Sequence, residues 1–121
     1  MKKQETVARD RTYRVLRDLG VPEHLSGFGC LTEAVTLAAC DPSLTRKLTA
    51  SLYPEVGRRC NCTAAAAERA MRHAIETAWI RSDPRTQTFY FGSTIDPGKG
   101  KPVNSEFIAR ISDAVRQEVL C

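Results

Sequence analysis

Four side chains that can contact nucleic acid stand at helical spacing in the middle of the chain. Glu68, Arg69, Arg72 and His73 would project from one side of a helix, because residues three and four positions apart lie above one another. An arginine on such a face can donate two parallel hydrogen bonds to guanine O6 and N7, and a glutamate can accept one from cytosine N4. A histidine can meet a phosphate or a base edge. These residue types predict a face that reads DNA.

The same charges also fit a plain solvated helix surface. Glu68 and Arg72 stand four positions apart, as do Arg72 and Glu76, and this is the spacing at which opposite charges pair on a helix. The pattern alone therefore leaves two interpretations open, a reading face and a set of surface salt bridges.

Two short helices joined by a tight turn would position this face. Pro54 suits the first helical position, where its missing N–H would have had no helical partner. Asn61 supplies the turn, because asparagine enters the left-handed region at low cost. Thr63 would cap the second helix, and Gly57 would let the two helices approach closely. The sequence therefore predicts a helix-turn-helix over about 54–81.

The rest of the chain reads as helices with clear breaks. Amphipathic helices are predicted over about 5–19 and 26–40, a third runs from Pro42 through Leu52, and a last one begins near Asn104. The first would turn inward the side chains of Val7, Tyr13, Leu16 and Leu19. The predicted core is Leu16, Leu31, Val35, Leu48, Val56, Ala70, Ala74, Ile75, Trp79, Ile108 and Ile111.

The segment between the motif and the last helix is not predicted to form one long helix. It carries six glycines and prolines between residues 82 and 103, which is too many for one long helix. Its aromatic cluster, Phe89 to Gly92, is predicted to pack this loop onto the core. An all-α fold follows from these patterns.

The composition limits the possible functions but does not single out one of them. A chain of 121 residues is expected to form one domain over 1–121, and its formal charge of +4, from 18 Lys and Arg against 14 Asp and Glu, is mildly basic. DNA attraction would then come from clustered cations. Arg58 and Arg59 lie within the motif, and Lys99 and Lys101 lie on a Gly-rich loop that can reach a phosphate backbone.

Cysteine usage predicts a reducing compartment, and so the cytoplasm. The five cysteines are an odd number, no secretory signal precedes them, and Cys60 and Cys62 lack the CxxC spacing of a zinc site. No metal or cofactor is expected. No base, nucleophile and orienting acid stand at a recognisable spacing, so we expect no enzyme, and no apolar run is long enough to span a membrane.

Several blocks of the sequence carry a family resemblance. The run AAERAMRHAIETAW, with YPEVGRRC before it and KPVNSEFIARI after it, resembles the C-terminal DNA-binding effector domain of the stage-zero sporulation response regulators of endospore-forming bacteria (sporulation initiation transcription factor, type A). The resemblance extends back through LGVPEHLSGFGCLTEAV and covers about residues 12 to 118. It implies a compact bundle of about six helices, whose recognition helix, 63–81, binds a box of the form TGNCGAA to regulate transcription.

The resemblance also implies which residues contact DNA. Glu68, Arg69, Arg72 and His73 match the family's base and phosphate contacts, whereas Ala65, Ala66 and Ala67 stand where the family commonly has Ser-Arg-Val. The full candidate set for DNA binding is Glu68, Arg69, Arg72, His73, Thr63, Arg58, Arg59 and Lys101.

The family's partners are further expectations. The segment from Ser82 to Ile95 would contact the sigma subunit of RNA polymerase and so mediate activation, and two copies would bind adjacent boxes as a homodimer on double-stranded DNA. Family members usually carry a phosphoreceiver domain upstream, and none is present in these residues. The alternative is an interaction module that kept the fold but lost DNA reading, and that binds polymerase or a full-length paralogue as an antagonist.

Overall fold

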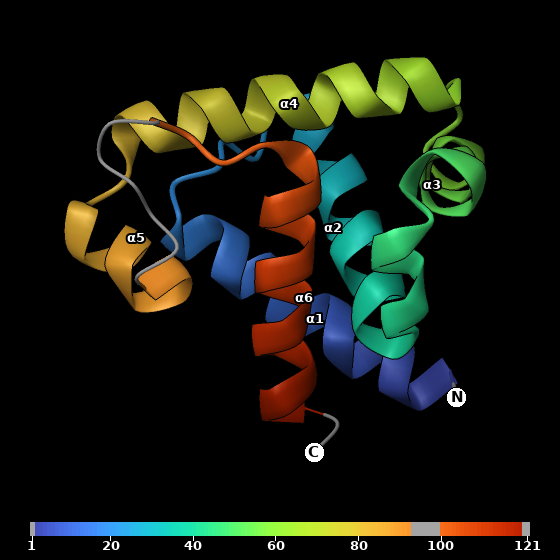
Figure 1. The fold of residues 1–121 in the computed structure, drawn as a ribbon, viewed down its shortest axis with the longest axis horizontal. Coiled ribbons are helices and arrows are strands. Elements are labelled where there is room, and N and C mark those ends of the chain that lie inside the picture. Colours follow the sequence, from blue (N-terminus) through green and yellow to red (C-terminus); the bar gives the residue numbers. More distant parts are fainter. Residues whose placement is uncertain (1, 93–99, 120–121) are drawn as a thin grey trace.

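The structure, a computed structural model, describes residues 2–92 and 100–119, and the regular secondary structure of those residues is all helical (Figure 1). The predicted all-α bundle of six helices is confirmed. The α-helices are α1 (Lys2–Asp18), α2 (Ser26–Cys40), α3 (Tyr53–Arg59), α4 (Ala64–Arg81), α5 (Pro84–Phe91) and α6 (Asn104–Val119). Between α2 and α3 lie a short 3₁₀ helix, η1 (Pro42–Arg46), and a π-helical turn, η2 (Leu48–Leu52).

Side-chain caps set where three of these elements begin. The Asp41 carboxylate accepts a hydrogen bond from the backbone N–H of Ser43, and the Asp83 carboxylate accepts one from that of Arg85. In both cases a proline follows the aspartate, in the first turn where no N–H is needed. Thr63 caps α4 in the same way.

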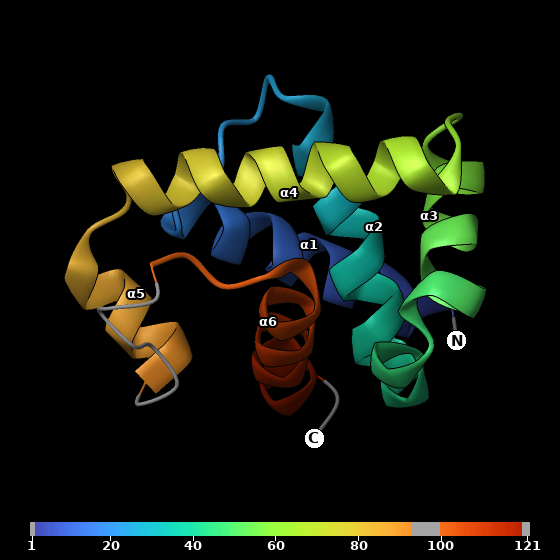
Figure 2. The same ribbon diagram turned by 45° about the horizontal axis from the view of Figure 1, so that its top comes forward.

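Helix α2 lies at the centre of the bundle and contacts α1, α3, α4 and α6. Ten of its fifteen residues are buried. Gly27 lets it approach α4 closely, because a β-carbon there would overlap the carbonyl oxygen of Ala70. Helix α4 runs across the top of the molecule in Figure 1, with α3 near one end and α5 near the other, and it stays on the outside in Figure 2.

Most of the predicted core is confirmed. Fully or nearly fully buried are Leu16, Leu31, Val35, Val56, Ala74, Ile75, Ile108 and Ile111. Leu48, Ala70 and Trp79 are partly buried and pack against that core. The Trp79 ring meets the buried Phe91 ring edge to face at 5.2 Å between centroids.

The predicted inward face of the first helix is wrong at two positions. Val7 is 45% exposed and Tyr13 is 37% exposed. The helix instead turns small side chains inward, including Ala8 and Thr12, and the Thr12 hydroxyl donates to the Ala8 carbonyl oxygen at 2.8 Å. Because that hydroxyl is satisfied within the helix, it can be buried without a partner from another element. The inward stripe is Ala8, Thr12, Val15, Leu16 and Leu19.

The predicted continuous helix from Pro42 through Leu52 is also wrong. Lys47, with φ −133° and ψ 44°, leaves the helical region and separates η1 from η2. The segment that begins at Ser82 contains a short helix, α5 (Pro84–Phe91), and its aromatic cluster divides there: Tyr90 and Phe91 are buried, whereas Phe89 is 78% exposed.

Candidate nucleic-acid interface

The turn between α3 and α4 has the predicted chemistry. Asn61 adopts φ 59°, the left-handed conformation expected of it. The backbone N–H of Cys62 donates to the carbonyl oxygen of Gly57 at 2.8 Å, and the Thr63 hydroxyl accepts from the N–H of Ala66 at 3.0 Å. A β-carbon on Gly57 would lie 2.5 Å from the Cys62 carbonyl oxygen. The two helices therefore meet as closely as a glycine permits.

Helix α4 divides into a buried stripe and an exposed face. The stripe buries Ala67, Met71, Ala74, Ile75 and Ala78. The opposite face exposes Ala65, Arg69, Arg72 and His73, while Glu68 and Glu76 are half-buried along its edge. Three of the four predicted reading residues thus share a solvent-facing surface, and the fourth borders it.

The two arginines of this face differ in their partners. The Arg72 guanidinium pairs with the Glu68 carboxylate one turn earlier on the same helix. Arg69 is exposed and has no ion-pair partner among the residues that the structure describes. Their spacing places the two guanidinium groups on adjacent turns, where both are accessible to a ligand that approaches α4.

The start of α6 anchors this face and adds a cation to it. The Asn104 amide donates to the backbone carbonyl oxygen of Glu68 at 3.0 Å. Lys101, three residues earlier, places its Nζ 3.5 Å from a carboxylate oxygen of Glu76. Lys101 and Arg72 both border a hollow of about 340 Å³ beside α4. The structure therefore brings the predicted loop lysine to the reading face, while Lys99 lies outside the described residues.

The predicted cations on α3 are placed differently. Arg58 pairs with Glu55 within its own helix, and its side chain is 71% exposed. Arg59 is 25% exposed and lies 3.1–3.2 Å from carboxylates of Glu5, Glu33 and Glu55. The guanidinium of Arg59 thus joins α1, α2 and α3 and is occupied by protein carboxylates.

A second arginine, Arg9, contacts the same junction. Arg9 forms two hydrogen bonds with the Glu33 carboxylate, at 3.1 and 2.9 Å. Burial alone would raise the pKa of Glu33, but the hydrogen bonds and charges of Arg9 and Arg59 outweigh it and lower the pKa. Hydrogen bonds from Arg58 and Arg59 lower the pKa of Glu55 to about 2. The carboxylates therefore remain charged at neutral pH.

The sequence did not identify the partners that shape the site. The sequence shows that Glu5 and Arg9 stand four positions apart on one helix, where they can pair. It does not show that Glu33, 24 positions beyond Arg9, contacts Arg9 as well. Asn104 reaches α4 across 36 positions. Pairings over such separations depend on how helices pack, and no local pattern indicates them.

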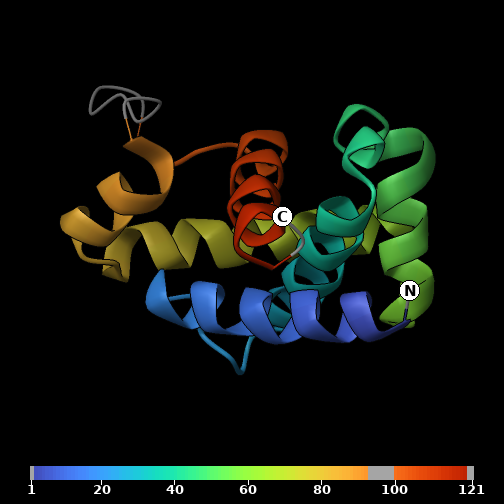
Figure 3. The ribbon, with the colours of Figure 1, turned by 90° about the horizontal axis from the view of Figure 1, so that it is seen from below.

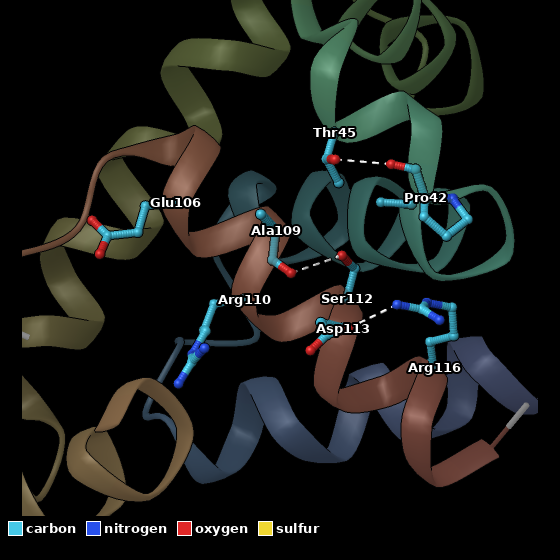
Figure 4. Close-up of a pocket in the computed structure, with 9 residues that line it drawn as sticks. Pro42, Thr45, Glu106, Ala109, Arg110, Ser112, Asp113 and Arg116 are labelled. Atoms are coloured by element: carbon cyan, nitrogen blue, oxygen red, sulfur yellow. Dashed lines mark hydrogen bonds and ion pairs between the residues drawn. The ribbon is translucent and has the colours of Figure 1, made fainter. Parts of the chain in front are cut away.

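A second hollow, of about 360 Å³, lies between η1 and α6 (Figure 4). The Asp113 carboxylate there pairs with Arg116 at 2.7 Å, and Arg110 donates to the carbonyl oxygens of Tyr90 and Phe91 at 3.2 and 3.3 Å. None of its lining residues comes from α4. Within residues 2–92 and 100–119, no group of three or more His, Cys, Asp or Glu side chains could hold a metal ion.

The predicted polymerase segment has an unusual surface. In α5, Phe89 is exposed, and at the end of α4 the side chain of Ile80 is 86% exposed. Arg85 pairs with Asp83 at 3.1 Å. Ile95, at the far end of the predicted segment, lies outside the described residues.

A family model described as "Sporulation initiation factor Spo0A C terminal" matches residues 12–115 of this 121-residue chain. The matched part includes α3, the turn, α4 and most of α6. No helix in the described part of the chain is long and apolar enough to cross a membrane.

Proposed function

The chain belongs to the family of Spo0A C-terminal domains, which are DNA-binding regulators of transcription in sporulation and effector domains of response regulators, and we propose that it reads DNA with the exposed face of α4. The observation that supports this most is the pair of accessible guanidinium groups, Arg69 and Arg72, on adjacent turns of a helix with one uncovered side. Residues 1–121 would act as one unit, and a DNA-binding role would place it in the cytoplasm. The family is regulatory and not catalytic.

The proposed base contacts follow from the chemistry of that face. Arg69 and Arg72 would each donate two hydrogen bonds to a guanine, and Glu68 would accept one from a cytosine amino group. His73 would meet a neighbouring base edge or phosphate. Because Arg72 pairs with Glu68 in the unbound chain, reading requires this ion pair to open or to rotate toward the groove. The proposed target is a box of the form TGNCGAA.

The proposed phosphate contacts surround the reading face. Thr63 caps the N-terminus of α4, where backbone N–H groups and the positive end of the helix dipole favour a phosphate. Lys101 and Arg58 would meet phosphates on either side, since both side chains reach solvent. Arg59 would act differently and hold α3 in place, because its guanidinium is already bound by three carboxylates.

A titration against two duplexes at fixed salt tests this function. One duplex carries a TGNCGAA box and the other carries the same bases scrambled, and retention of each is measured by gel shift. We expect the boxed duplex to bind about 10³-fold or more tightly, the lower end of specific over non-specific affinity. Equal and weak binding to both would contradict the proposal.

A second function is favoured by one feature, the alanines at the start of α4. Ala65 is exposed and Ala66 is half-buried, so neither supplies a polar or basic contact where the family commonly has one. The chain would then be an interaction module that binds polymerase or a full-length paralogue as an antagonist. Equal, weak binding in the duplex titration would favour this function over the first.

For activation, we propose that α5 contacts the sigma subunit of RNA polymerase, within the segment from Ser82 to Ile95. The exposed Phe89 and the neighbouring charges at Asp83 and Arg85 support this surface. Arg85→Glu should reduce activated transcription in vitro and leave DNA retention unchanged. Loss of DNA retention with polymerase contact intact would show that the segment serves DNA binding instead.

Two copies on adjacent boxes form the last part of the proposal. We expect a duplex with two boxes to bind the second copy more tightly than the first, in a head-to-tail arrangement. Independent binding to the two boxes, measured by the ratio of singly and doubly shifted bands, would contradict a homodimer on DNA.

A further inference from the structure

The lysine proposed to contact a phosphate is already paired with a carboxylate. The Nζ of Lys101 lies 3.5 Å from a carboxylate oxygen of Glu76, which α4 supplies from the edge of its exposed face. The side chain of Lys101 is 33% exposed and that of Glu76 is 45% exposed. Solvent therefore reaches the pair, and a phosphate that binds Lys101 must take it from Glu76.

Glu76 pairs with Lys101 although a cation of its own helix is near. It stands four positions after Arg72, a spacing at which opposite charges can pair. In the structure, Arg72 instead pairs with Glu68, four positions before it. A glutamate that precedes its cation on a helix is the better placed of the two, so this choice leaves Glu76 to Lys101.

A buried hydrogen bond keeps Lys101 beside Glu76. Three residues after Lys101, the Asn104 amide donates to the Glu68 carbonyl oxygen at 3.0 Å, and Asn104 is only 8% exposed. This bond fixes the start of α6 on α4, so Lys101 is attached by a short segment and stays near Glu76. The ion pair then costs less conformational entropy than one between two unrestrained side chains.

We propose that Glu76 sets the strength of DNA binding by competing with phosphate for Lys101. Before DNA binds, the Glu76 carboxylate holds the Lys101 ammonium group, and in the complex this group moves to a phosphate oxygen. Glu76 is then left without its cation beside a polyanion, where like charges repel. Both effects oppose binding, and neither depends on base sequence. This inference rests on the proposed function, which assigns a phosphate contact to Lys101.

Substitution of Glu76 in two backgrounds tests the competition. Glu76→Gln is made in the natural chain and in Lys101→Ala, and each is compared with its parent on boxed and scrambled duplexes. Fluorescence anisotropy at low salt measures the affinities, because ion pairs are then least screened. Asp10→Asn is the matched control: it makes the same change of net charge and releases Arg14 from an exposed pair of 3.4 Å on α1.

We expect Glu76→Gln to tighten binding to both duplexes about two- to fivefold, the effect of one solvent-accessible ion pair. The gain should be clearly smaller in the Lys101→Ala background, and smaller again in Asp10→Asn. An equal gain without Lys101 would overturn the proposal, because Glu76 would then act through its own charge alone. A gain no larger than that of Asp10→Asn would overturn it as well.

Lysine modification without DNA separates this inference from the proposed function. Acetic anhydride acylates accessible amines, and peptide mass spectrometry compares Lys101 with Lys47, an exposed lysine between η1 and η2. Glu76→Gln should speed acylation of Lys101 relative to Lys47, because the amine is no longer held by a carboxylate. An unchanged ratio would show that Glu76 does not hold Lys101. A raised ratio in a chain that binds boxed and scrambled duplexes equally would contradict the proposed function alone.

Discussion

Arginines meet carboxylates in two regions of this molecule, and the two regions are built differently. At the junction of α1, α2 and α3, Arg59 binds carboxylates from all three helices, including Glu33, whose side chain is only 20% exposed. On α4, Arg72 binds only Glu68 of its own helix, and Arg69 has no ion-pair partner in the part of the chain that the structure describes. The first region connects helices, whereas the second leaves its cations accessible.

The helix that supplies the carboxylate therefore distinguishes a structural arginine, such as Arg59, from one that is available to bind a ligand, such as Arg72. An acceptor on another helix is held in place by packing, so the pair resists exchange with an external ligand. An acceptor four positions away on the same exposed surface is worth only a few tenths of a kcal/mol, about 0.3–0.5 kcal/mol, and a phosphate or a base can replace it.

The largest effect should come from removing an available arginine. Arg72→Ala should weaken binding to the boxed duplex by about 1–3 kcal/mol and relax preference at one base pair, because a bidentate guanine contact is lost. The unfolding free energy should change by less than about 0.5 kcal/mol, as for other exposed positions. Gel shift and urea unfolding measure the two. Arg14→Ala, an exposed arginine on α1, is the control and should change neither.

The structural arginine should show the opposite pattern. Arg59→Ala should lower the free energy of unfolding by about 1–2 kcal/mol, because Glu5, Glu33 and Glu55 lose a shared partner in a half-buried setting. DNA affinity of the folded chain should stay unchanged. Arg58→Ala is the matched control, since that side chain is exposed and meets only Glu55. A loss of DNA affinity without a loss of stability would place Arg59 with the reading residues.

Acid should lower the stability that the junction of α1, α2 and α3 contributes. The folded-state pKa of Glu33 is lowered from its ordinary 4.5, and that of Glu55 is lowered to about 2. A lowered folded pKa gives stability that is complete above the unfolded value and is lost as pH falls through the folded one. Urea unfolding between pH 5 and pH 2 should therefore show falling stability, with a shallower fall in Glu33→Gln. An equal slope in that variant would mean that Glu33 contributes no pH dependence.

The smallest effect should come from the cation beside the reading face. Lys101→Ala should weaken boxed and scrambled duplexes about equally, because a phosphate contact carries no base information. The slope of log affinity against log salt should fall by about 1. Titrations at several salt concentrations measure it, and a selective loss on the boxed duplex would instead assign Lys101 to base reading.

Local chemistry made the helix-turn-helix predictable from the sequence. Asn61 and Thr63 act within a few residues of themselves, so residue type alone indicated the turn and the cap, and the structure confirms both. The buried stripe and the exposed face of α4 were predictable from the spacing of apolar and charged residues along the helix. The reading roles of Glu68 and Arg69 remain predictions, because they depend on a ligand.

The sequence predictions that proved wrong, or that missed a contact, depend on packing between segments far apart in the chain. The sequence placed Val7 on the inward face of α1, whereas the structure buries Ala8, because the inward face is set by how α1 packs against α2 and α6. Arg59 looked like any basic residue of the motif, since its partners Glu5 and Glu33 lie 54 and 26 positions away. The exposure of Phe89 was not predicted either, because large aromatic side chains are usually buried.

The tether from Asn104 to the Glu68 carbonyl bears on how the chain is synthesised. It joins the last helix to the middle of α4, and Arg11 of the first helix pairs with Glu118 near the end of the last. Helices α1 and α6 also pack against each other (Figure 3). A nascent chain that has exposed α4 but still holds α6 in the ribosome lacks both connections. We expect the reading face to become rigid only when α6 has emerged, so a growing chain would not compete with finished copies for DNA during translation.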